Sequence, residues 1–197
     1  MILPSQAPGG DTICLFAGPQ DWITWLDVHH ATSAGIWLRI AKKGAPIPSV
    51  SYAEALDAAL CYGWIDARKE AESEHTWLQR FTPRRPKSIW SKINREKVAA
   101  LIKAGRMQAA GLTQIANAKK DGRWEAAYDS PAGAGVPEDL QAALDQNAKA
   151  KAFFATLNRA NRYAILWRIQ TAKKAETRAR RIGQFVEMLA KHEKLHP

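Results

Sequence analysis

Residues 51–66 have the sequence SYAEALDAALCYGWID, in which a helix pattern leads directly into a strand pattern. Ser51 and Glu54 have the spacing of a capping box, where each side chain accepts a hydrogen bond from the other residue's backbone N–H. The apolar side chains that follow recur at helical spacing as far as Gly63, and glycine commonly ends helices. The stretch therefore predicts a helix from Ser51 and a strand from Trp64.

The elements on either side predict a small sheet. Residues 12–17 form a short apolar run, and residues 35–42 alternate apolar and other side chains, as strands do. Residues 19–32 between them place apolar side chains at helical spacing. After the helix, residues 64–70 and 76–82 predict the two strands of a hairpin. This order is typical of an α+β region with a small mixed sheet and helices.

The remainder of the chain predicts helices. Two are expected at residues 91–105 and 108–120, followed by the small, uncharged stretch SPAGAGVP at 130–137, which is typical of a linker. Further helical patterns follow it. We therefore expect a flexible N-terminus at 1–11, an α+β N-terminal region at 12–130 and a helical C-terminal domain at 131–197.

The composition excludes several classes of protein. Of 197 residues, 46% are hydrophobic and 24% charged, as in globular domains. The two cysteines, Cys14 and Cys61, lie in apolar runs and exclude a disulfide framework or a four-cysteine zinc site. Neither an export signal nor a long apolar stretch is apparent, so we expect a cytoplasmic protein with no membrane span. No motif indicates a cofactor.

Positive charge is concentrated late in the chain. Residues 1–80 hold 6 Lys and Arg against 9 Asp and Glu, whereas residues 81–130 hold 11 against 4 and residues 131–197 hold 12 against 6. Such asymmetry favours an anionic partner, although basic helix faces also serve solubility. Nucleic-acid binding through the C-terminal helices is one hypothesis, but no known nucleic-acid-binding motif is present.

Single residues give weaker indications. His29 and His30 point about 100° apart on a helix, so we expect no metal site, with His29 in the core beside Trp25 and His30 in solvent. Cys61 lies near a helix C-terminus, which favours a buried structural cysteine over a reactive thiolate. Arg178 lies on the apolar face of the last helix and is expected to snorkel or to form a buried bond.

Asp66 follows two apolar residues at the start of a strand, where an acid must face solvent or be paired. We expect a nearby arginine to pair with it. Catalysis by Asp66 together with Glu54 or Asp57 is an alternative, although sequence spacing does not place two carboxylates across one site.

The densest unusual segment is residues 79–95, where prolines stiffen the chain and cations alternate with aromatic residues ahead of a helix. Arginine forks, serine hydroxyls and an aromatic platform suit phosphate or another oxyanion. The competing interpretation is a rigid connector whose arginines pair with acids. The candidate ligand-binding residues are Trp64, Asp66, Arg80, Arg84, Arg85, Lys87, Ser88 and Trp90.

These motifs resemble those of one family. GIWLRIAKK at 35–43, the stretch at 51–66, RFTPRRPKSIWSKIN at 80–94, VPEDL at 136–140 and AKKAETRARRI at 172–182 resemble the YdeI/OmpD-associated family, also called bacteriocin-protection proteins. The resemblance extends over residues 12–197, and the C-terminal part resembles the family's helical domain. Ala67 departs from the pattern, since a glycine after the aspartate is more typical.

The resemblance implies a role in resistance to bacteriocins or cationic antimicrobial peptides, and it implies no catalytic residue. Because a chain of charge +10 repels cationic peptides, we expect an indirect route through an anionic small molecule or an acidic protein. The favoured hypothesis is a binding module. The alternatives are a nucleic-acid-binding protein and an enzyme that acts on a phosphate- or carboxylate-bearing small molecule, with Asp66 as base.

Overall fold

The computed structural model describes residues 5–6, 12–131 and 133–197. Its contacts divide the chain into two compact units, the first made of Met1–Trp90 and Asn94–Ala126, the second of Ser91–Ile93 and Ala127–Pro197. The predicted fold class is confirmed, with a mixed sheet and helices first and helices alone afterwards. Apart from residues 5–6, the N-terminal segment predicted to be flexible lies outside the described residues. The domain limits drawn from composition stay predictions.

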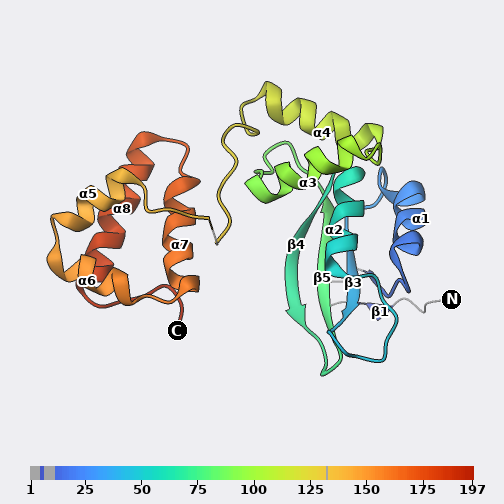
Figure 1. Cartoon of the computed structure of the whole chain (residues 1–197), viewed down its shortest axis with the longest axis horizontal. Coiled ribbons are helices and arrows are strands. Elements are labelled where there is room, and N and C mark those ends of the chain that lie inside the picture. Colours follow the sequence, from blue (N-terminus) through green and yellow to red (C-terminus); the bar gives the residue numbers. More distant parts are fainter. Residues whose placement is uncertain (1–4, 7–11, 132) are drawn as a thin grey trace. The chain divides into compact units, whose positions relative to one another are not determined.

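The sheet of the first unit contains five strands in the order β1-β2-β3-β5-β4. Among the strands that the structure describes, only β2 and β3 pair in parallel, so the sheet is mixed. Figure 1 shows β4 and β5 as two long arrows side by side, which confirms the predicted hairpin. The strands are β1 (Ser5–Gln6), β2 (Thr12–Cys14), β3 (Ile36–Ala41), β4 (Trp64–Ala71) and β5 (Thr76–Pro83).

Between residues 12 and 131 the structure describes four helices, α1 (Pro19–His29), α2 (Tyr52–Cys61), α3 (Lys92–Lys103) and α4 (Ala109–Lys120). The capping box at the start of α2 is present in full. The bond from the Ser51 hydroxyl lowers the pKa of Glu54. Gly63, with φ of +76°, follows α2 in the left-handed region that glycine tolerates best. The helix ends where the sequence predicts.

Aromatic rings form the centre of the core between α1, α2 and the sheet. Trp22 of α1 has no exposed surface, and its ring lies 5.8 Å from that of Phe81 and 6.3 Å from that of Trp64. Its indole N–H donates to the carbonyl of Ala55 in α2 at 3.1 Å. The tryptophan therefore joins two helices to the sheet through both apolar contact and a satisfied polar group.

The two adjacent histidines differ from expectation. The ring centres of His29 and Trp25 lie 4.8 Å apart, so His29 is beside Trp25 as predicted. His29 is exposed, however, so the prediction that it lies in the core is wrong. His30 was expected in solvent and is instead half-buried, with Nδ1 2.8 Å from the carbonyl oxygen of Leu26 and its ring against Tyr62. The reason is that α1 ends at this point, and the chain turns His30 toward the end of α2.

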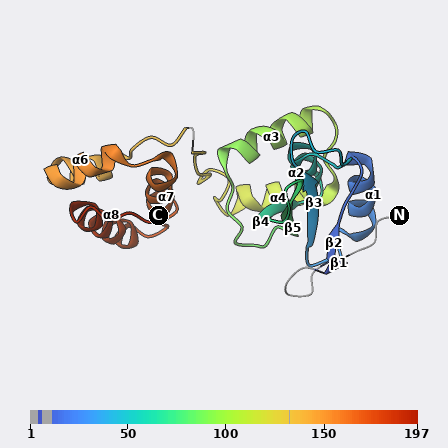
Figure 2. The same ribbon diagram turned by 90° about the horizontal axis from the view of Figure 1, so that it is seen from below.

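The second unit is a group of helices, and Figure 2 shows α6, α7 and α8 close together within it. They are α5 (Glu138–Asp145), α6 (Ala148–Thr156), α7 (Arg159–Gln170) and α8 (Ala175–Ala190). Every helix contributes at least two buried apolar residues to one shared core. On α7, Tyr163 and Gln170 hold Asp129 by hydrogen bonds, which fixes the segment that enters the unit.

Arg178 pairs with Asp139 at a partly exposed position, whereas the sequence suggests snorkelling or a buried bond. Its guanidinium donates to both carboxylate oxygens of Asp139 and also to the carbonyl of Ile169 at 3.0 Å. This pairing lowers the pKa of Asp139. The carboxylate is thus held more strongly as an anion in the folded chain than in the unfolded one.

When the pKa of a group is lower in the folded chain than in the unfolded chain, the group stabilises the fold at pH values above its unfolded-state pKa. This stabilisation is lost as the pH falls through the folded-state pKa. We expect the free energy of unfolding of the helical unit to fall by about 0.5 kcal/mol as the pH drops below about 4 and this ion pair is lost. The value is small because Asp139 is partly exposed. Asp139→Asn should remove this part of the pH dependence. Unfolding followed by circular dichroism at pH 6 and pH 3 measures it, with Glu138→Gln as the control. Equal acid sensitivity of Asp139→Asn and the wild type would contradict the assignment.

Candidate functional site

The segment between β5 and α3 is a compact loop built around a buried arginine. Arg84 is only 5% exposed, and its guanidinium carbon lies 3.6 Å from the centre of the Trp90 ring. Its Nη1 donates to the carbonyl of Ile89 at 3.1 Å, across the loop. Stacking and hydrogen bonding together make Arg84 an internal support of the loop, because a buried cation is stabilised by such contacts.

Trp90 closes the other end of the loop. It is buried, and its ring meets that of Trp124 edge-on at 4.9 Å. Arg95 donates to the carbonyl of Trp124 at 2.8 Å and places its guanidinium near the same ring. The aromatic residue that the sequence suggests as an open platform is therefore packed inside the first unit, where it positions the loop.

Ser88 turns the loop and attaches it to the end of α4. Its hydroxyl accepts from the backbone N–H of Arg85 at 2.9 Å, and its carbonyl accepts from Arg123 at 2.9 Å. Arg123, itself 9% exposed, also donates from Nε to both oxygens of Asp121 at 2.8 Å. Ser88 thus holds the loop through both its hydroxyl and its carbonyl, and the Asp121–Arg123 pair fixes a surface that faces the loop.

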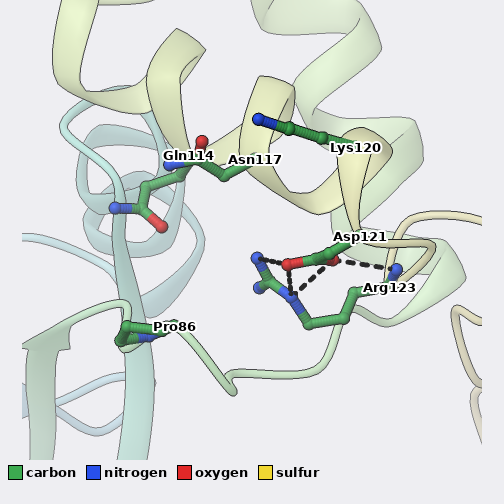
Figure 3. Close-up of a pocket in the computed structure, with 6 residues that line it drawn as sticks. All are labelled: Pro86, Gln114, Asn117, Lys120, Asp121 and Arg123. Atoms are coloured by element: carbon green, nitrogen blue, oxygen red, sulfur yellow. Dashed lines mark hydrogen bonds and ion pairs between the residues drawn. The ribbon is translucent and has the colours of Figure 1, made fainter.

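A pocket of about 370 Å³ lies between this loop and the C-terminal half of α4. Figure 3 shows Pro86 on one side and the paired Asp121 and Arg123 on the other. Arg85 and Lys87, which flank Pro86, are both exposed. We call this space the loop pocket; its lining residues are Pro86, Gln114, Asn117, Lys120, Asp121 and Arg123.

The other three candidate residues lie elsewhere in the first unit. Trp64 is 1% exposed and donates its indole N–H to the carbonyl of His30 at 3.0 Å, so it belongs to the core. Asp66 pairs across the sheet with Phe81, and Arg80 pairs with Trp37. Because adjacent strand residues point to opposite faces, Asp66 and Arg80 lie on different sides of the sheet.

The carboxylates considered for catalysis each have a partner of their own. The Tyr52 hydroxyl donates to Asp66 at 2.9 Å, which corrects the expectation of an arginine. Glu54 belongs to the capping box, and Asp57 accepts from Lys97 at 2.7 Å. The helix start brings Tyr52 close to β4 through tertiary packing, a contact that sequence spacing does not reveal.

Five of the six lining residues lie outside the segment 79–95 that the sequence singles out, and a sequence signal exists for three of them, Lys120, Asp121 and Arg123. Residues 119–123 have the sequence KKDGR, a charged cluster placed directly at the end of a helix. This cluster is separated from the 84–90 loop by many residues in the sequence, so the sequence alone does not predict that the two are in contact. Gln114 and Asn117 carry no such signal, since isolated amides on a helix are usually solvated.

Two further observations bear on chemistry. Among the residues that the structure describes, no group of three or more His, Cys, Asp or Glu side chains is arranged to hold a metal ion. Cys61 is buried as predicted, and burial raises the pKa of its thiol. A raised pKa keeps the sulfur protonated, which is unsuited to nucleophilic attack.

Comparison with known families divides the chain in two. Residues 14–114 match the family described as Domain of unknown function (DUF8412), which is just over half of the chain. The chain belongs to this family. The DUF8412 match contains the 84–90 loop and Gln114, while residues 117–123 of the loop pocket lie beyond it.

Residues 134–192 match a second family, described as Bacteriocin-protection, YdeI or OmpD-Associated. The resemblance predicted from the sequence is thereby confirmed over the helices of the second unit, a narrower range than residues 12–197. No curated protein and no solved structure matches this DUF8412 chain. Within the described residues, no helix is long and apolar enough to cross a membrane.

Proposed function

We propose that this protein is a binding module in resistance to bacteriocins or cationic antimicrobial peptides, and that it acts indirectly through an anionic ligand in the loop pocket. The observation that carries the proposal is the pocket itself, where Lys120 and two amides line a space beside the exposed Arg85 and Lys87. The match of residues 134–192 to a bacteriocin-protection family supports the biological role.

The charge of the chain favours the indirect route. At +10, the protein repels a cationic peptide at long range, so direct capture of such a peptide is disfavoured. The same charge attracts phosphorylated or carboxylated molecules. We therefore place the ligand among the small anions of the cytoplasm, and an acidic protein segment would use the same chemistry.

The lining residues suit a small anion that also forms hydrogen bonds. Lys120 supplies a positive charge, while Gln114 and Asn117 supply donors and acceptors. Asp121 carries a negative charge, but its ion pair with Arg123 at 2.7 Å offsets it. The volume falls in the range of roughly 300–1,000 Å³ typical of small-molecule pockets.

Calorimetric titration of the full chain with pyrophosphate and with citrate tests the proposal. The triple variant Arg85→Ala, Lys87→Ala, Lys120→Ala should bind the preferred anion at least about tenfold more weakly, because it removes the lining cation Lys120 and the two exposed cations that flank Pro86. These side chains are exposed, so the fold should be retained. The matched control removes three exposed lysines from the second unit, Lys149, Lys173 and Lys174.

The biological arm uses bacteria that lack their own copy of the gene and are exposed to a cationic peptide. The wild type and the control variant should restore survival, whereas the loop-pocket variant should not. If the loop-pocket variant protects fully, the pocket does not carry the function. If only the control variant fails, the basic helices are responsible, which would favour the nucleic-acid hypothesis.

A further inference from the structure

We infer a second ligand site at the other end of the sheet, where Lys42, Lys43 and Lys69 gather around Trp77 and fit a nucleoside phosphate. The space is about 490 Å³ and is otherwise lined by two alanines, Ala41 and Ala71. It lies where β3 and β4 end and β5 begins, whereas the loop pocket follows the end of β5. We call it the lysine pocket.

The concentration of cations here is unusual for this part of the chain. Residues 1–80 carry only six Lys and Arg, and three of them line the lysine pocket. The two nearby arginines are already paired, Arg39 with Glu72 at 2.6 Å and Arg68 with Glu70 at 2.9 Å. None of the three lysines forms an ion pair with a described residue, so their charge is available to a ligand.

Glu74 lies near the lysine pocket and, unlike Glu70 and Glu72, forms no ion pair with a described residue. It is exposed in the turn between β4 and β5. It contributes one negative charge against three positive charges. None of the six lining residues is acidic, so the lining as a whole is cationic.

The tryptophan is held in place by contacts on its own side of the sheet. The Tyr52 ring lies 5.9 Å from the ring of Trp77, and its hydroxyl is fixed by Asp66. Ala71 pairs directly with Trp77 across the hairpin, and its small side chain leaves space beside the indole. Trp77 is half-buried and therefore presents part of its surface to the pocket.

Two of the lysines are positioned by the same elements. The ammonium of Lys69 lies 4.6 Å from the centre of the Trp77 ring, and that of Lys42 donates to the carbonyl of Ser73 at 2.8 Å. A planar aromatic group that approaches the indole would compete with Lys69 for the ring. The displaced ammonium then lies next to the ligand and can pair with its phosphate.

This combination selects the class of ligand. Lysine ammonium groups bind phosphate as point charges, and an indole ring stacks on any nucleobase. A molecule that joins a planar base to phosphates satisfies both, and the volume suits a mononucleotide. We therefore identify the occupant as a nucleoside phosphate.

Calorimetric titration of the full chain with ATP, tripolyphosphate and adenosine tests the inference. ATP should bind more tightly than either fragment, since only ATP engages both the lysines and the indole. The variant Lys42→Ala, Lys43→Ala, Lys69→Ala should lose at least about tenfold in ATP affinity. Trp77→Leu should lose about fivefold or more for ATP and leave tripolyphosphate binding unchanged.

Three outcomes would overturn the inference. The first is an ATP affinity of the triple lysine variant that stays within twofold of the wild type. The second is equal binding of ATP and tripolyphosphate. The third is loss of ATP binding in the loop-pocket variant with retention in the lysine variant, since ATP would then occupy the loop pocket. The control is Lys103→Ala, an exposed lysine that lines neither pocket, and it should bind ATP as the wild type does.

Discussion

Replacement of Gly111 by alanine is expected to lower the free energy of unfolding by about 3 kcal/mol or more. Gly111 lies in α4 where that helix crosses the end of α2. An added Cβ would stand 2.2 Å from the carbonyl oxygen of Cys61 and 2.9 Å from its carbonyl carbon. Both atoms are backbone, and the adjacent bond from Gln108 N–H to the same carbonyl holds them in place. Urea unfolding followed by tryptophan fluorescence measures the loss, because only Trp167 lies outside the first unit.

Gly183 provides the matched control, since it is also helical. A Cβ built there meets nothing within 4 Å. Gly183→Ala should therefore stabilise the protein by about 0.5–1 kcal/mol through higher helix propensity. Circular dichroism reports this change in α8. If Gly111→Ala unfolds at the same urea concentration as the wild type, α2 and α4 do not cross as described.

Replacement of Trp22 by alanine is expected to cost about 3–5 kcal/mol, the range for removal of a large buried aromatic side chain. Trp22 has no exposed surface and contacts rings from three other parts of the first unit. The change leaves a cavity and also removes the donor to Ala55. Urea unfolding measures the effect in the same way as for Gly111.

Two further variants distinguish the loss of the Trp22 hydrogen bond from the loss of its buried ring. Trp22→Phe keeps an aromatic ring but loses the hydrogen bond, and about 1–2 kcal/mol of destabilisation is expected. Val28 lies on the same helix and is 68% exposed, so Val28→Ala should change stability by less than about 0.5 kcal/mol. Equal effects of Trp22→Ala and Val28→Ala would contradict the central position of the ring.

Local sequence patterns point to the 84–90 loop as a cationic, proline-containing segment, and the structure shows a turn there at Ser88. These patterns do not separate residues that support the loop, such as Arg84 and Trp90, from exposed residues such as Arg85 and Lys87. Spacing along a chain does not say which side of a loop faces inward, because the packing of distant residues decides it.

Local sequence patterns account for the main helices and strands of this protein, although not for β1 (Ser5–Gln6). The capping box at Ser51, the glycine after α2 and the alternation in β3 depend on residues a few positions apart, and these local features form as the spacing predicts. The division into an α+β part and a helical part follows from the order of these elements.

Which of these elements come into contact depends on tertiary packing. Tyr52 reaches Asp66, α4 closes on Cys61, the 84–90 loop faces residues 114–123, and Lys42 and Lys43 join Lys69 around Trp77. Each of these contacts joins segments separated by many residues. Their formation depends on sheet register and helix packing over the whole unit, and neither can be predicted from the local periodicity of the sequence.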